Sequence, residues 1–151
     1  MISKKLLIVL KIIHEKLKDK KLDWALIGST NLALQGIKIK PKDIDILTDK
    51  KSAFEINKLL KEYEIEPVRL SNSKLFGPQY FGEFKIEDIK IEVIGKLKKE
   101  RLLTKIIKID GMNLPAVSLE EELKAYEALG RKKDFNKIKK IEEFLKSKFQ
   151  I

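Results

Sequence analysis

Residues 24–49, WALIGSTNLALQGIKIKPKDIDILTD, contain the pattern that decides the fold. The apolar run at 24–27 stops at Gly28-Ser29, as expected for a strand that leads through a tight turn into a helix N-terminus. Gly36 is placed to end that short helix. Residues 43–48 are a second strand candidate, and polar and apolar side chains alternate over 43–46, which is typical of a half-buried strand. The stretch therefore predicts a strand, a glycine turn, a helix and a second strand.

The remaining pattern predicts a single domain over residues 1–151, with a core at about 20–117 and C-terminal helices at about 118–149. Helical spacing and caps predict further helices at 3–18, from 49–52 to 63, at 118–130 and after Asp134, and period-two segments predict strands at 67–70, 80–86, 89–94, 106–109 and 112–117. The Ser-, Asn-, Gly- and Pro-rich stretch 71–82 is expected to be a loop leading into a strand. The predicted class is α/β (α+β), a mixed and mostly antiparallel sheet flanked by helices.

Two details of the helices can be tested directly. Helical periodicity places Phe54 and Phe135 on the buried faces of their helices. Asp49 and Ser52 are both candidate N-caps for the helix that ends near Tyr63, and Asp134 is the candidate cap of the last helix.

Composition excludes several classes of site. The 151 residues include no Cys, so there is no disulfide, thiolate metal site or cysteine nucleophile. The net charge of +10 favours anionic partners such as nucleotides or RNA, although a lysine-rich solvated surface gives the same charge. The longest apolar run, 6–10, is far shorter than the roughly 20 residues that cross a bilayer, so we expect a cytoplasmic protein without a membrane partner. The 30 Lys and 21 Ile fit a heat-adapted organism.

Three carboxylates have the pattern of an oxygen-ligand metal site. Asp43 and Asp45 alternate with Ile44 and Ile46, so both acids project from the face opposite to the buried one. Glu92 alternates with apolar residues in the same way. Neighbouring like charges are tolerated where they face water or where a cation neutralises them. The three acids therefore form either a Mg²⁺ site or part of the solvent face of an ordinary sheet. The first alternative is chemically suitable because Mg²⁺ prefers carboxylates, water and phosphates as ligands.

The Gly28-Ser29 turn favours the first alternative. A strand, a glycine turn and a helix N-terminus present backbone N–H groups to a phosphate. The turn precedes Asp43 by 15 residues, and a phosphate site followed by paired acids suits a metal-bound triphosphate.

The ordered set Gly28-Ser29, Asp43-Ile44-Asp45 and Glu92 resembles the signature of the DNA polymerase beta-like nucleotidyltransferase superfamily. Residues 24–29, 33–36 and 43–49 look like its small aminoglycoside and lincosamide adenylyltransferase-like branch. Residues 91–95 and 129–134 resemble two further segments of that branch. The resemblance thus extends over most of the chain and implies the nucleotidyltransferase fold.

The resemblance also implies roles for individual residues. Asp43 and Asp45 would bind two Mg²⁺ ions, with Mn²⁺ as the alternative, and Glu92 would complete the metal site and help to deprotonate the acceptor hydroxyl. Gly28 and Ser29 would hold the β and γ phosphates of a nucleoside triphosphate.

The sequence departs from the branch at two points. Many relatives have Arg and Thr shortly before the paired acids, whereas residues 39–42 here leave Lys40 or Lys42 to supply the basic contact. The third carboxylate is Glu where many relatives have Asp.

The resulting hypothesis is a metal-dependent enzyme that moves a nucleoside monophosphate from a triphosphate, ATP by preference, to an acceptor hydroxyl with release of pyrophosphate. The acceptor is a small molecule or, alternatively, RNA, as in nucleotidyltransferases of toxin–antitoxin modules. A non-catalytic nucleotide-binding module is the third interpretation, against which the complete set of carboxylates argues. The sequence leaves the acceptor and the oligomeric state open.

Overall fold

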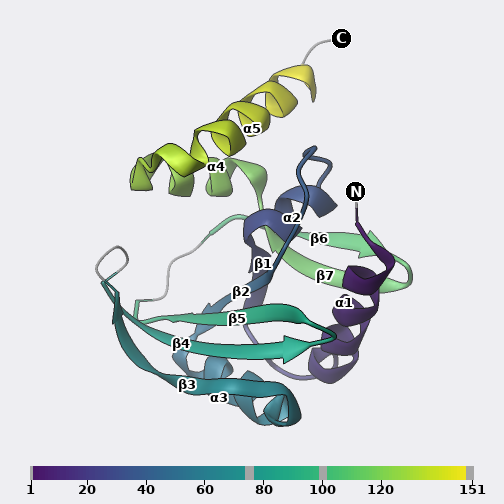
Figure 1. Cartoon of the computed structure of the whole chain (residues 1–151), viewed down its shortest axis with the longest axis vertical. Helices are drawn as coiled ribbons and strands as arrows, with labels where there is room; N and C mark the ends of the chain where they lie inside the picture. The colour runs from purple at the N-terminus through teal and green to yellow at the C-terminus, as the bar shows by residue number, and fades with distance from the viewer. Residues whose placement is uncertain (1, 74–76, 99–101, 149–151) are drawn as a thin grey trace.

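The computed structural model describes residues 2–73, 77–98 and 102–148. Over these residues the strands form one seven-stranded sheet in the order β3-β4-β5-β2-β1-β7-β6 (Figure 1). The strands are β1 (Trp24–Ile27), β2 (Ile44–Asp49), β3 (Glu64–Ser73), β4 (Gly77–Ile86), β5 (Ile89–Lys96), β6 (Thr104–Ile109) and β7 (Met112–Val117). β2 pairs with β5 and β1 with β7 in parallel, and the other pairs are antiparallel. The predicted mixed, mostly antiparallel sheet is confirmed.

Helices lie on one face of the sheet and around one end of it. They are α1 (Lys4–Leu17), α2 (Gly28–Leu34), α3 (Lys50–Leu59), α4 (Leu119–Leu129) and α5 (Phe135–Lys148), with 3₁₀ turns at Lys61–Tyr63 and Lys132–Asp134. α1 and α3 contact each other and the strands of the sheet, while α4 and α5 lie beyond α2, away from α3 (Figure 1). No helix among the described residues is both long and apolar enough to span a membrane.

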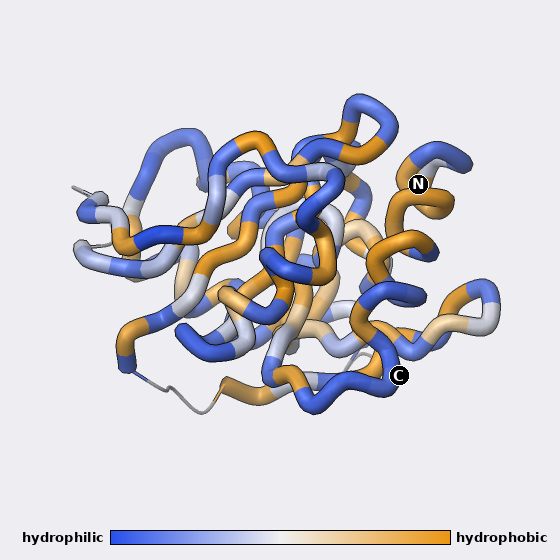
Figure 2. The backbone as a smooth tube through the Cα atoms, turned by 90° about the horizontal axis from the view of Figure 1, so that it is seen from below, coloured by the Kyte–Doolittle hydropathy of each residue, from blue (hydrophilic) through white to orange (hydrophobic). Residues whose placement is uncertain are grey.

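Two clusters of buried side chains hold these layers together. The main cluster joins α1 and α3 to the sheet through residues such as Leu10, Ile56 and Phe84. Figure 2 shows the hydrophobic and hydrophilic residues alternating along α1, next to the N-terminus. The second cluster, which includes Leu32 and Ile141, packs the C-terminal helices on α2. The C-terminal helices therefore pack on α2 and the residues that follow it rather than on the main cluster.

The prediction of a loop is wrong for residues 71–73 and 77–79, whereas the strand predicted from residue 80 onward is confirmed. β3 continues to Ser73 and β4 begins at Gly77, because their backbones pair as far as these two residues. β3 is an edge strand, where polar and turn-forming residues are tolerated. Residues 74–76, in the middle of the predicted loop, fall outside the described residues.

The two aromatic residues expected on buried helix faces are partly exposed. Phe54 is 39% exposed and Phe135 59% exposed. The buried stripe of α3 runs through Ala53 and Ile56, and Phe54 borders it, with its ring edge-on to Tyr80 at 5.6 Å. Of the two candidate caps of α3, Asp49 is used: its carboxylate accepts the backbone N–H of Ser52.

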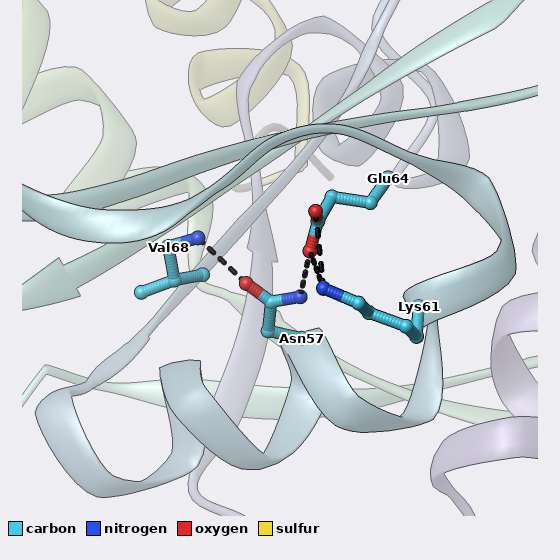
Figure 3. Close-up of polar contacts among 4 residues, drawn as sticks. All are labelled: Asn57, Lys61, Glu64 and Val68. Carbon is cyan, nitrogen blue, oxygen red and sulfur yellow. Dashed lines mark hydrogen bonds and ion pairs between the residues drawn. The ribbon is translucent and has the colours of Figure 1, made fainter.

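Asn57 ties the edge hairpin to α3 (Figure 3). Its Oδ1 accepts the buried backbone N–H of Val68 at 2.6 Å, and its Nδ2 donates to Glu64 at 2.6 Å, where Lys61 also donates at 3.0 Å. The pairing of β3 with β4 changes register on either side of Glu66, close to Val68. The side-chain amide thus provides a partner for a backbone group at an irregularity of the ladder.

Candidate active site

A pocket of about 690 Å³ lies between the open face of the sheet and the C-terminal helices. All seven residues that the sequence analysis selected line it: Gly28, Ser29, Lys40, Lys42, Asp43, Asp45 and Glu92. The structure therefore brings together a glycine turn, three acids and two lysines that span 65 positions of the chain.

Strand register places the acids. Asp45 is directly opposite Glu92 in the parallel β2–β5 pair, and Asp43 immediately precedes β2. The intervening Ile44 is completely buried on the other face. Ile27 pairs with Asp45 across the antiparallel β1–β2 ladder, which carries the following glycine turn to the same point.

Asp45 is the most buried of the three acids. Burial, and then the charges of Glu92 and Asp43, raise the pKa of Asp45 to about 7. Its Oδ1 is buried and receives no hydrogen bond from the part of the chain that the structure describes. Burial of a carboxylate oxygen without a hydrogen-bond partner costs free energy, and a bound cation would reduce this cost by neutralising the negative charge.

Lys90 lies between two of the acids and was not selected by the sequence analysis. Its Nζ is 3.2 Å from Oε1 of Glu92 and 3.7 Å from Oδ2 of Asp43. The hydrogen bond to Glu92 and the charges of both acids raise the pKa of Lys90. The signal was present in the sequence, because a residue two positions before Glu92 on a strand faces the same side.

The turn at Gly28 needs glycine for two reasons. Its φ of +79° lies in the left-handed region, and a Cβ there would stand 2.6 Å from Oδ2 of Asp45. Its backbone N–H donates to Oε2 of Glu122 in α4 at 2.8 Å. The amide therefore has a protein partner in this structure, while the hydroxyl of the neighbouring Ser29 accepts a long 3.4 Å contact from the Lys42 amide.

Glu122 is the second site residue that the sequence analysis missed. Its buried Oε2 also accepts from Nδ2 of Asn31 at 2.9 Å. Burial raises its pKa to about 7, against the lowering effect of the bonds from Asn31 and Gly28. Glu122 follows Leu119 by three positions and precedes Tyr126 by four, so helical spacing places it on the apolar face of the helix. A glutamate on that face is the feature of the sequence that could have identified it as a site residue.

We expect Glu122→Gln to gain stability relative to the wild type as the pH rises. A carboxyl whose pKa is raised on folding costs stability once the pH exceeds its unfolded value, and the cost levels off above its folded value. The stability difference should shift in favour of Gln by about 2 kcal/mol between pH 5 and pH 8. Urea unfolding at the two pH values measures it.

The matched control for this prediction is Glu120→Gln, which removes the same charge from an exposed position of the same helix. Its effect should be nearly independent of pH over this range. A pH-independent effect of Glu122→Gln as well would mean that Glu122 is ionised in the native protein without a penalty.

The C-terminal helices add a basic wall to the pocket, formed by Arg131, Lys133 and Lys137. Two of these side chains are held by Asp134, which is completely buried: Nε of Arg131 donates to it at 2.7 Å, and Nζ of Lys137 lies 3.9 Å away. The carboxylate of Asp134, a candidate cap in the sequence, thus orients cations toward the pocket.

The donor set suits a magnesium ion. Mg²⁺ binds hard oxygen ligands and is held by one or two carboxylates together with waters and substrate phosphates. Among the described residues no group of three His, Asp or Glu converges on one position that could hold a metal. The paired acids Asp43 and Asp45, with the unpartnered Oδ1 of Asp45, still provide the number of carboxylates that such an ion uses.

Comparisons with known proteins agree with this arrangement. Residues 9–141 match the sequence model of the aminoglycoside-2''-adenylyltransferase family. The crystal structure of a candidate nucleotidyltransferase from Thermotoga maritima is 33% identical, covers 97% of this chain and 96% of its own, and has a TM-score of 0.82. No curated protein sequence gives a significant match.

Two antibiotic-modifying enzymes have the same fold. ANT(2'')-Ia, in complex with adenylyl-2''-tobramycin, is 12% identical, with 91% of this chain and 88% of that chain covered and a TM-score of 0.58. The lincosamide antibiotic adenylyltransferase LnuA, bound to lincomycin, is 14% identical, with 94% and 97% covered and a TM-score of 0.59. The family match over most of the sequence, together with the Thermotoga relative, establishes that the chain belongs to the aminoglycoside-2''-adenylyltransferase family of nucleotidyltransferases.

Proposed function

We propose that this protein transfers a nucleoside monophosphate from a nucleoside triphosphate, ATP by preference, to an acceptor hydroxyl and releases pyrophosphate. The observation that carries the proposal is that the Gly28 turn, the paired acids and the basic wall line the same pocket. Family membership supports nucleotidyl transfer as the reaction class.

The residues of the pocket divide the chemistry between them. Asp43 and Asp45 would hold Mg²⁺, with Mn²⁺ as the alternative, and such an ion stabilises the charge that develops on the attacking and leaving oxygens. Glu92, on the neighbouring strand, would complete the metal site and help to accept the proton of the acceptor hydroxyl. The hydroxyl oxygen attacks the α-phosphorus, the bond to the bridging oxygen breaks, and pyrophosphate leaves.

The triphosphate requires positive charge on the other side of the pocket. Lys40 and Lys42 at the entrance to β2 and the basic wall of the C-terminal helices are suited to this role. Lysine acts as a point charge, whereas the Arg131 guanidinium, fixed by Asp134, offers donors in a defined direction. Binding and positioning by these groups supply the remaining stabilisation.

A small-molecule acceptor is the first choice. The pocket volume of about 690 Å³ lies within the range of ligand pockets for small molecules. ANT(2'')-Ia and LnuA were solved with antibiotic-derived ligands, which supports an acceptor of comparable size. The net charge of +10 favours RNA as the second choice.

The test is incubation with Mg²⁺, each α-labelled nucleoside triphosphate and a panel of acceptors that contains hydroxylated antibiotics and RNA. We expect labelled product and pyrophosphate with ATP, and neither after chelation of the metal. For an RNA acceptor, binding would weaken steeply with salt because phosphate contacts release counterions. Nucleotide binding without pyrophosphate release over the whole panel would instead indicate a non-catalytic module.

A further inference from the structure

Lys90 occupies the place where a cation is expected among the acids. It precedes Ile91 on β5, as Asp43 precedes Ile44 on β2, and these two isoleucines are paired. Its ammonium therefore reaches Asp43 across the parallel ladder, at 3.7 Å, and Glu92 along its own strand, at 3.2 Å. One positive charge partly balances three carboxylates.

The geometry of Lys90 allows the ammonium to leave. Its side chain is 42% exposed, and Asp43 is similarly exposed at 40%. Lysine is a compact charge on a flexible four-carbon stem, so it can move into solvent without disturbing the backbone. Neither contact is part of the buried core, and both acids line the pocket.

We propose that Lys90 is an internal counter-cation that competes with the divalent metal for Asp43 and Glu92, so that metal binds tightly only together with nucleotide. This inference rests on the proposed function. A metal ion alone must displace the ammonium from two carboxylates. A nucleotide adds phosphate oxygens to the metal's ligands and gives the displaced ammonium an anionic partner, which shifts the balance toward the metal.

An ordinary surface ion pair is the competing explanation for these contacts. Such a pair changes local stability slightly and has no effect on a ligand elsewhere. Competition for the same oxygens, in contrast, requires that removal of the ammonium strengthens metal binding. It also requires that nucleotide and metal enhance each other's binding less in the variant without the ammonium than in the wild type, since the coupling between two ligands is reciprocal.

The experiment is a Mn²⁺ titration of the full chain, with free ion measured by electron paramagnetic resonance, in the presence and absence of a non-hydrolysable ATP analogue. For Lys90→Met without nucleotide we expect the Kd for Mn²⁺ to fall by about three- to fivefold, which is the upper end of the effect that exposed ion pairs produce. The enhancement of Mn²⁺ affinity by nucleotide should shrink by a similar factor. Lys90→Gln provides a second neutral variant, and unfolding curves verify that both fold.

Two further variants show whether the effect on Mn²⁺ binding comes from the position of Lys90 or from the net charge of the protein. Lys90→Arg keeps the charge and should stay close to the wild type. Lys85→Met removes one charge from an exposed residue directly opposite Lys90 on β4, and its Kd should stay within about twofold. An unchanged Kd in Lys90→Met, or an equal change in Lys85→Met, would overturn the proposal that Lys90 is a counter-cation.

The variant Asp45→Asn shows whether a negative result refutes only the role of Lys90 or also the proposed function. If it abolishes Mn²⁺ binding while Lys90→Met leaves binding unchanged, the metal site stands and only the counter-cation is overturned. If Asp45→Asn leaves Mn²⁺ binding intact, the ion binds elsewhere, and both the counter-cation and the proposed metal site fail.

Discussion

Replacement of Asp45 by asparagine is expected to abolish nucleotidyl transfer, with a loss on the order of 10³-fold or more in kcat. The replacement removes a metal-binding charge at the centre of the pocket, where β2 faces both Glu92 and the glycine turn. The transfer assay with ATP measures the loss. In a thermal shift experiment, Mg²⁺ with a non-hydrolysable triphosphate should raise the Tm of the wild type, because it binds only the native state, and Asp45→Asn should lose most of that shift.

The same variant should fold as well as the wild type without metal. The pKa of Asp45 is raised to about 7, so its ionisation above that pH opposes folding. Asparagine removes this cost, and we expect stability at pH 8 to be unchanged or higher by about 1 to 3 kcal/mol, with the gain shrinking as the pH falls toward 4. A marked loss of stability in metal-free protein would assign Asp45 a structural role.

Gly28→Ala should weaken binding of MgATP by about tenfold or more, since alanine disfavours the positive φ and its Cβ would displace the Asp45 carboxylate. Isothermal titration gives the dissociation constant. A parallel titration with Mn²⁺ alone separates two causes. Displacement of Asp45 would weaken both titrations, whereas loss of a phosphate contact at the turn would weaken only the nucleotide.

Gly36→Ala is the matched control for Gly28→Ala. Gly36 lies just beyond the other end of α2, also has a positive φ, of +103°, and its added Cβ would meet the Phe144 ring at 3.1 Å. Both variants therefore carry backbone strain of about 1 kcal/mol or more, and only one of them lies beside the acids. Equal dissociation constants in folded Gly28→Ala and wild type would remove the turn from the site.

The positions of the acids were predictable because side-chain alternation along a strand has a period of two. Ile44 is buried and Asp45 faces the pocket, as the pattern requires. That Glu92 is opposite Asp45 depends on strand order and register, which alternation does not encode; the family resemblance supplied that expectation. Lys90 and Glu122 were missed because their roles depend on neighbours 47 and 94 positions away.

The errors in the fold prediction have a common physical origin. Residues 71–73 and 77–79 are strand because they pair with each other, although their composition favours loops. Phe54 and Phe135 have helical spacing, but Phe54 lies at the border of a buried stripe and Phe135 is the first residue of its helix, and both are exposed. Tertiary context decides such cases.

The bond between Gly28 and Glu122 has a consequence for how the protein is made. It joins residues 94 positions apart, and the cluster around Leu32 likewise depends on the last two helices. During synthesis the glycine turn and the paired acids leave the ribosome long before α4 does. Until the later helices have been made, the chain lacks both the glutamate that anchors the turn and the basic wall, so the pocket cannot be complete before that point of synthesis.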